Sequence, residues 1–193
     1  MTFAPERVAD GGEPAASRPY LLEKLRAVRL LLLDVDGVLT DGQITYTEQG
    51  HETKSFSVRD GLGIRLLTDA GIPVGIVTAR SSEALRHRCR NLGIDLVFEG
   101  AMDKRAVLEP VMARTGVPAP GIAFVGDDLL DLPLMRSVGL AVAVADAHEL
   151  LLAHADMVTR NRGGQGAVRE VCEALLKARG LWENIQRRFV GNE

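Results

Sequence analysis

The stretch LLLLDVDG at residues 30–37 decides how the rest of this sequence is interpreted. Its four consecutive leucines are typical of a strand buried on both faces, as in the parallel sheets of α/β proteins. The run ends abruptly at Asp34 and Asp36, whose side chains point the same way in an extended chain, with Cα atoms about 6–7 Å apart. We therefore expect a buried strand that delivers two carboxylates to one edge of a sheet.

Strands and helices alternate along the rest of the chain. Apolar runs predict further strands at about residues 73–77, 95–98, 122–125, 140–144 and 157–158. Helical spacing predicts helices at about residues 20–28, 60–71, 81–92, 104–115, 129–138, 147–153 and 166–178. Residues 43–58 instead alternate apolar with polar side chains around a glycine-containing turn, which indicates a β-hairpin. The predicted fold class is α/β: a Rossmann-like parallel sheet with helices on both faces and an inserted hairpin.

The composition is that of a compact globular protein. The 193 residues suit one domain, and 46% of them are hydrophobic and 25% charged. A net charge of −3 without a Lys/Arg block gives no sign of a nucleic-acid partner, and the apolar runs are too short to span a membrane. Cys89 and Cys172 lie in helical patterns, so we interpret them as buried thiols rather than a disulfide.

The two ends of the chain are interpreted as lying outside the domain. Residues 1–19 lack the apolar stretch of a signal peptide and are expected to form a disordered tail, which favours a cytoplasmic location. Residues 20–180 are expected to form the domain, and residues 181–193 a C-terminal tail.

Polar residues follow three of the predicted strands at the point where each strand ends. Asp34 and Asp36 follow the first, Thr78-Ala79-Arg80 the second and Gly126-Asp127-Asp128 the third. Ligands of an open parallel sheet bind at the carboxyl ends of its strands. We therefore expect these groups to face one crevice.

This set of side chains suits metal-assisted phosphoryl transfer. Mg²⁺ prefers oxygen ligands, which Asp34, Asp127 and the Asp36 carbonyl could supply. Asp34 could attack phosphorus to form an aspartyl-phosphate, while Asp36 first protonates the leaving oxygen and then deprotonates a water. Lys104 could neutralise phosphate charge, and the Thr78 hydroxyl could bond a phosphate oxygen. The combination predicts an enzyme that uses Mg²⁺ and a carboxylate nucleophile.

At these motifs the sequence resembles the haloacid-dehalogenase-like phosphatases. DVDGVLT at residues 34–40, Thr78, Lys104 and GDDLLD at residues 126–131 match their four motifs. The resemblance implies that Asp34 is nucleophile and metal ligand, that Asp36 is the acid/base and substrate contact, and that Asp127 is a metal ligand. The resemblance does not decide whether Asp128 and Asp131 lie next to the metal site or supply a further metal ligand.

The spacing of the motifs leaves no room for a separate cap domain. Residues 36–78 can hold a hairpin and a helix, and residues 78–104 one helix and one strand. A capless site is open in a monomer, and a projecting hairpin could pack against a symmetry mate to close it.

Residues 30–176 are similar, more narrowly, to the branch of this family that hydrolyses 3-deoxy-D-manno-octulosonate 8-phosphate in lipopolysaccharide biosynthesis. FSVRDGLG at residues 56–63, AVADA at residues 143–147 and GGQGAVRE at residues 163–170 carry this resemblance, and Ala79 departs from it where many relatives have glycine. It implies a homotetramer whose sites are completed by neighbouring subunits, and a sugar-acid phosphate as substrate. The guanidinium groups of arginines can bind the carboxylate and the phosphate of such a substrate with two hydrogen bonds each. The implied substrate contacts are Asp36, Ser57, Val58, Arg59, Asp60, Gly61, Arg65, Arg80, Arg88 and Lys104.

Several alternatives stay open at this point. The same motifs would serve a phosphatase of a nine-carbon sugar-acid 9-phosphate, or a broad phosphatase. A phosphate switch like a receiver domain also combines an accepting Asp with Thr and Lys, although Asp36 argues against a long-lived phospho-aspartate. A catalytically idle tetramerisation module is disfavoured by the intact acidic residues and Lys104. Arg65 and Arg88 lie in predicted helices, where a solvated helix face is an equal interpretation of each.

Overall fold

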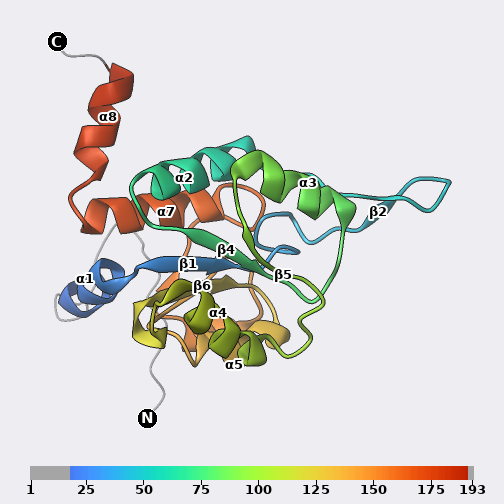
Figure 1. Ribbon diagram of the computed structural model, residues 1–193, viewed down its shortest axis with the longest axis horizontal. Helices are drawn as coiled ribbons and strands as arrows, with labels where there is room; N and C mark the ends of the chain where they lie inside the picture. Colours follow the sequence, from blue (N-terminus) through green and yellow to red (C-terminus); the bar gives the residue numbers. More distant parts are fainter. Residues whose placement is uncertain (1–17, 191–193) are drawn as a thin grey trace.

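The computed structural model describes residues 18–190 (Figure 1). The disordered tail expected at residues 1–19 lies outside the described residues, except that residues 18 and 19 begin helix α1, Arg18–Ala27. No helix within residues 18–190 is both long and apolar enough to cross a membrane.

A six-stranded parallel sheet forms the centre of the molecule, in the order β5-β4-β1-β6-β7-β8. Strand β1, the leucine run, is completely buried in the middle, with Leu33 opposite Ile76 on one side and Val125 on the other. The fold class is therefore the predicted one. The strands are β1 Leu30–Leu33, β4 Val74–Val77, β5 Leu96–Phe98, β6 Ile122–Gly126, β7 Leu140–Ala143 and β8 Met157–Val158.

Helices cover both faces of the sheet (Figure 1). On one face lie α2 (Val58–Asp69), α3 (Glu83–Leu92) and α7 (Ala167–Ala178), and on the other lie α4 (Leu108–Thr115) and α5 (Leu132–Met135). A short helix α6, Glu149–His154, connects β7 to β8. The core between these layers consists almost entirely of leucine, isoleucine, valine and alanine.

The order in which the chain adds strands to the sheet determines where the site lies. From β1 the chain continues to β4 and β5 on one side, and then crosses to β6, β7 and β8 on the other. A sheet that reverses its direction of growth in this way has a crevice at the carboxyl ends of the strands beside the reversal. Here those ends belong to β1, β4 and β6, the three strands that the polar motifs follow.

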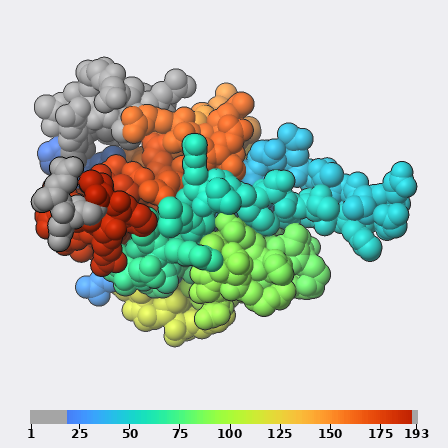
Figure 2. Space-filling view, turned by 90° about the horizontal axis from the view of Figure 1, so that it is seen from above, coloured from blue at the N-terminus to red at the C-terminus, as the bar shows by residue number. Residues whose placement is uncertain are grey.

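The inserted hairpin is present but shorter in its strands than expected. It pairs β2, Thr45–Tyr46, with β3, Glu52–Thr53, and projects from the body of the molecule as an arm (Figure 2). Val58, expected at the end of the hairpin, is instead the first residue of α2, and the Ser57 hydroxyl caps that helix by accepting the amide N–H of Arg59 and Asp60. Hairpin and α2 fill the described chain between the first two motifs, so no cap domain is inserted there.

The segment expected as a C-terminal tail contains a helix. Residues Trp182–Val190 form α8, which follows α7 and buries Ile185. The ring of Trp182 lies 5.6 Å from the Arg169 guanidinium carbon, which joins α8 to α7. Figure 1 shows α8 at the end of the molecule opposite the hairpin.

Candidate active site

Asp34 lies at the carboxyl end of β1 and is almost completely buried. Its amide N–H donates to the Val125 carbonyl at 3.0 Å, which continues the pairing of β1 with β6. The Lys104 ammonium, only 3% exposed, lies 2.7 Å from Asp34 Oδ1 and 2.5 Å from Asp131 Oδ1. Lys104 begins a 3-10 turn capped by the Asp103 carboxylate. The structure thus brings the first, third and fourth predicted motifs together around one buried lysine.

Asp131 has a supporting place in this cluster. Its Oδ2 accepts the amide N–H of Asp127 at 2.9 Å and of Asp128 at 3.2 Å, while Oδ1 accepts from Lys104. Both oxygens are therefore used to hold the loop after β6. Asp128 is exposed, and its carboxylate caps the next turn by accepting the Leu129 amide at 2.8 Å. Of the acidic residues in this motif, Asp127 is the one whose side chain hydrogen-bonds Asp34 rather than a backbone amide of the loop.

The carboxylates of Asp34, Asp127 and Asp131 repel one another. One oxygen from each lies within 4.8 Å of the others. Burial, followed by the negative charge of Asp131, raises the pKa of Asp34 to about 6. Burial, followed by the charge of Asp34, raises the pKa of Asp127 to about 8. A divalent cation would relieve this repulsion, and hard carboxylate oxygens are ligands that Mg²⁺ prefers. The residues present therefore fit Mg²⁺.

Gly37 makes room for this cluster. A Cβ at this position would lie 2.0 Å from Asp127 Oδ2, and the φ of +90° is one that L side chains rarely adopt. The chain can turn after Asp36 and still pass against Asp127 only because residue 37 is glycine.

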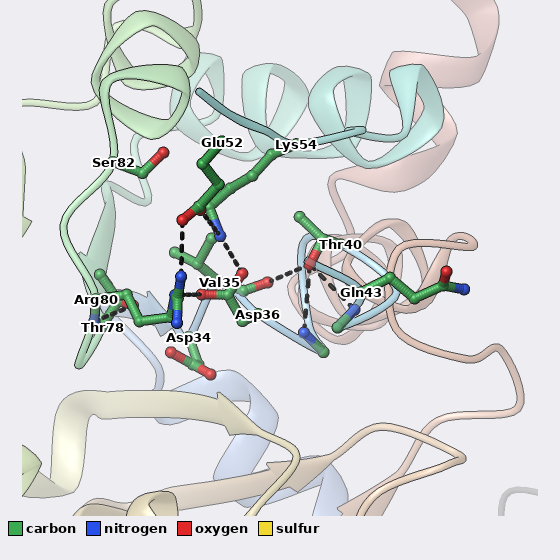
Figure 3. A network of polar contacts seen from close by, with 12 residues as sticks. Asp34, Val35, Asp36, Thr40, Gln43, Glu52, Lys54, Thr78, Arg80 and Ser82 are labelled. Carbon is green, nitrogen blue, oxygen red and sulfur yellow. Dashed lines mark hydrogen bonds and ion pairs between the residues drawn. The ribbon is translucent and has the colours of Figure 1, made fainter. Parts of the chain in front are cut away.

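Asp36 is half-buried and lies in a separate network of charges (Figure 3). The Lys54 ammonium donates to Asp36 Oδ1 and also lies 3.0 Å from Glu52 Oε1. Arg80 Nη2 donates to Glu52 Oε2 at 2.7 Å, and its Nε lies 3.6 Å from Asp36 Oδ2. Sequence reasoning missed Glu52 and Lys54. The alternating hairpin pattern predicts two faces but does not tell which face turns toward the catalytic residues.

Thr78 follows β4 and is 2% exposed. Its hydroxyl accepts the amide N–H of Arg80 at 3.3 Å, which shapes the loop that carries Arg80 toward Asp36. The second predicted motif thus lies beside the first, as the pairing of β4 with β1 requires.

The first turn of α2 contains the predicted substrate loop. Val58 is 81% exposed, and a Cβ on Gly61 would lie 2.3 Å from Arg88 Nη2, so glycine admits the arginine here. Asp60 also has a structural role. It is 1% exposed, and its two oxygens accept the amide N–H of Gly166 at 3.3 Å and of Arg169 at 2.7 Å. Asp60 therefore holds α2 to the start of α7, and its predicted contact with substrate stays a prediction.

Arg65 and Arg88 lie where α2 meets α3. Arg65 donates to the Asn91 carbonyl at 2.8 Å, and Arg88 donates to the Ser57 carbonyl at 3.1 Å. Among the hydrogen bonds and ion pairs of residues 18–190, none joins either arginine to the carboxylates of Asp34, Asp36 or Asp127. Their contact with substrate stays a prediction.

Known proteins match this chain over most of its length. A family model described as haloacid dehalogenase-like hydrolase matches residues 96–171. The 3-deoxy-D-manno-octulosonate 8-phosphate phosphatase of Salmonella typhimurium is 47% identical over 172 residues, which cover 89% of this chain and 92% of the relative. The chain belongs to the haloacid dehalogenase-like hydrolase family.

Solved structures of haloacid dehalogenase-like hydrolases agree with this assignment. A 3-deoxy-D-manno-octulosonate 8-phosphate phosphatase from Yersinia pestis superposes with a TM-score of 0.83 at 46% identity, covering 84% of this chain and 88% of that one. Another from Moraxella catarrhalis, in complex with a magnesium ion, a phosphate ion and a KDO molecule, gives a TM-score of 0.86 at 39% identity, covering 88% and 98%.

The chemistry available to this haloacid dehalogenase-like hydrolase follows from the two networks. Asp34 offers a buried carboxylate beside an ammonium, and Asp36 offers a second carboxylate held by a different lysine. One carboxylate can act as nucleophile while the other moves a proton, because separate partners hold them.

Proposed function

We propose that the protein is a magnesium-dependent phosphatase that hydrolyses 3-deoxy-D-manno-octulosonate 8-phosphate to the free sugar acid and phosphate in lipopolysaccharide biosynthesis. The observation that carries the proposal is the buried Asp34–Lys104–Asp131 cluster beside Asp127, built at the carboxyl ends of β1 and β6. Relatives with this activity in their names match about nine-tenths of the chain at 47% to 48% identity.

In the first step a carboxylate oxygen of Asp34 attacks the phosphorus of the substrate. An O–P bond forms to Asp34 while the ester P–O bond breaks, and the electron pair of that bond goes to the leaving sugar oxygen. Asp36 gives that oxygen its proton. The products are the free sugar acid and an aspartyl-phosphate on Asp34.

In the second step a water molecule attacks the phosphorus of the aspartyl-phosphate. Asp36, now a carboxylate, accepts a proton from the water, and the Asp34–phosphorus bond breaks to return the carboxylate and release phosphate. Lys104 would balance negative charge in both steps, a role that its 2.7 Å contact with Asp34 supports, and the buried Thr78 hydroxyl would bond a phosphate oxygen.

Mg²⁺ would be held by Asp34, Asp127 and the Asp36 carbonyl, and it supplies electrostatic stabilisation of the negative charge on the transferring phosphoryl group. Asp131 and Lys104 keep the carboxylate cluster in place around it.

The sugar-acid part of the substrate would meet the first turn of α2 and nearby arginines. Arg80 is the best placed of these, since its guanidinium already lies against Asp36 and is 40% exposed. The loop from Ser57 to Gly61, which includes Val58, Arg59 and Asp60, and the side chains of Arg65 and Arg88 complete the proposed set. Arg88 is held close by its bond to the Ser57 carbonyl.

We propose a homotetramer in which neighbouring subunits complete the sites. The projecting hairpin exposes Ile44 and Tyr46, which are 46% and 60% exposed, and such side chains are suited to an interface. We propose the cytoplasm as the compartment, which agrees with the free, buried thiols of Cys89 and Cys172.

Phosphate release tests the proposed function directly. The substrates are 3-deoxy-D-manno-octulosonate 8-phosphate, a nonulosonate 9-phosphate and common hexose phosphates, each with Mg²⁺ and with EDTA. The expected result is a strong preference for the eight-carbon acid that disappears in EDTA. Preference for another sugar phosphate would keep the Asp34 chemistry and replace the substrate, whereas no release from any would favour a phosphate switch or an idle module.

A further inference from the structure

We propose that Lys54 is a positioning residue for proton transfer by Asp36. The inference deepens the proposed function and rests on it, because it assigns a task to a hairpin side chain in the same reaction. Lys54 would hold one oxygen of Asp36 and leave the other to exchange the proton with the leaving group and with water.

The two cations that face Asp36 differ in their freedom to move. The Lys54 side chain is 2% exposed and lies between two carboxylates, those of Asp36 and Glu52. The Arg80 side chain is 40% exposed. A buried ammonium between two acceptors keeps its place, whereas the half-exposed Arg80 gives up only its 2.7 Å contact with Glu52 when it turns to a ligand. When Arg80 turns to the substrate, Lys54 stays on Asp36.

The two oxygens of Asp36 are also unequal. Oδ1 accepts from Lys54, while Oδ2 is buried and has no hydrogen-bond partner among the described residues. Arg80 Nε lies 3.6 Å from Oδ2, beyond hydrogen-bond distance, and that nitrogen has no hydrogen-bond partner among the described residues either. An unpaired buried oxygen costs free energy, so it is a natural place for a proton-exchanging partner. Oδ2 is therefore the oxygen that would exchange the proton.

The hairpin supplies this contact although it is not part of the central sheet whose strands carry the motifs. Glu52 and Lys54 descend from the arm onto Asp36 and Arg80 (Figure 3). Glu52 accepts from both cations, which ties the base of the hairpin to the acid/base residue.

The test compares substrates whose leaving groups do and do not need a proton. Lys54→Met keeps the apolar stem and removes the ammonium. With the sugar-acid phosphate, whose leaving oxygen must be protonated, we expect the rate of aspartyl-phosphate formation to fall roughly tenfold or more, as for loss of an oriented general acid. With p-nitrophenyl phosphate, whose leaving group is stable as an anion, we expect formation of the intermediate to change less than about threefold. KM for both substrates should change little.

A double-mutant comparison provides the second measurement. In an Asp36→Asn background, Lys54→Met should cost little further rate, because residues that act through one another are not additive. Lys24→Met is the matched control, since Lys24 forms a half-buried ion pair with Asp156 at 2.5 Å and we place it outside the site. It should retain wild-type rates with both substrates.

Equal loss with both leaving groups, full additivity with Asp36→Asn, or a rise in KM at unchanged kcat would overturn the assignment. If Lys54→Met does not fold, Lys54→Gln keeps a shorter neutral donor and should show the same leaving-group signature. Should wild-type protein prefer another sugar phosphate, the comparison is run with that substrate, so failure of the proposed substrate and failure of the Lys54 role remain distinct.

Discussion

Lys104 Nζ lies 2.7 Å from Asp34 Oδ1, and both side chains are almost completely buried. The same ammonium contacts Asp131 at 2.5 Å, so a single positive charge faces two carboxylates in the interior. Removing the ammonium would leave two buried carboxylates without a compensating positive charge.

Lys104→Met should therefore reduce both activity and stability. We expect kcat to fall by about 10² to 10³, as for the loss of one transition-state donor. The free energy of unfolding should fall by about 3–5 kcal/mol, the cost of breaking a buried ion pair. Phosphate release and urea unfolding measure the two effects. Lys177→Met, which removes a half-exposed lysine paired with Glu173, is the control. A stability loss with unchanged kcat would limit Lys104 to a structural role.

Asp34→Asn should abolish turnover while the fold remains intact. The substitution removes the nucleophile at nearly constant volume. Folding already disfavours the ionised form of Asp34, whose pKa is raised to about 6, so a neutral amide should not lower the thermal midpoint in EDTA at pH 7.5. Circular dichroism and phosphate release are the measurements, with Asp69→Asn at the exposed end of α2 as control. Normal turnover by Asp34→Asn would contradict the mechanism in which Asp34 is the nucleophile.

Stability should depend on pH and Mg²⁺ together. The folded-state pKa values of Asp34 and Asp127, about 6 and about 8, lie above their ordinary value, so the folded protein binds more protons than the unfolded chain in that window. In EDTA these two groups should lower stability as pH rises from about 4 toward about 8. Since the metal must displace those protons, the increase in Tm produced by Mg²⁺ should grow over the same range.

Asp127→Asn provides the control for this metal effect. It removes one proposed ligand and the group with the higher pKa, so the Mg²⁺-dependent increase in Tm should be lost or strongly reduced. If the Mg²⁺-dependent increase in Tm is the same at pH 5.5 and pH 8, or persists in Asp127→Asn, the metal binds at another site.

Asp60→Ala should act mainly through stability. It leaves the buried amide of Gly166 and the partly buried amide of Arg169 without their acceptor, which should cost about 1–3 kcal/mol in the free energy of unfolding. Asp60→Asn retains one acceptor oxygen and should lose less. Urea unfolding and Michaelis–Menten kinetics separate the possibilities, because a substrate-contacting Asp60 would instead raise KM without a comparable loss of stability.

The sheet and the position of the site were predictable because they depend on local patterns. The leucine run, the apolar strands and the residues that follow them specify a parallel sheet with Asp34, Thr78 and Asp127 at one edge, and the structure has this arrangement. Helix boundaries mostly agree within about two residues, the usual uncertainty of such boundaries.

What sequence reasoning missed depends on contacts between distant segments. Asp60 meets residues more than a hundred positions away, so nothing local distinguishes its structural role from a substrate contact. Lys54 acquires its partner only when the hairpin base folds over β1. Helix α8 lies in the segment that was expected to be a C-terminal tail. Its amphipathic spacing is recognised only once the burial of Ile185 is known.

The proposed tetramer gives the hairpin an assembly role that a pair of substitutions can test. Wild-type protein should have a mass near four times 20.8 kDa by light scattering. Ile44→Asp combined with Tyr46→Asp places charges on the exposed hairpin face, and should shift the mass to smaller species and lower kcat, because neighbouring subunits complete the sites. Leu150→Asp, at an exposed leucine of α6, should leave both mass and activity unchanged. A clean monomer mass for the wild-type protein with full activity would refute the assembly, while the Asp34 chemistry would stand, since every catalytic group named for it comes from a single chain.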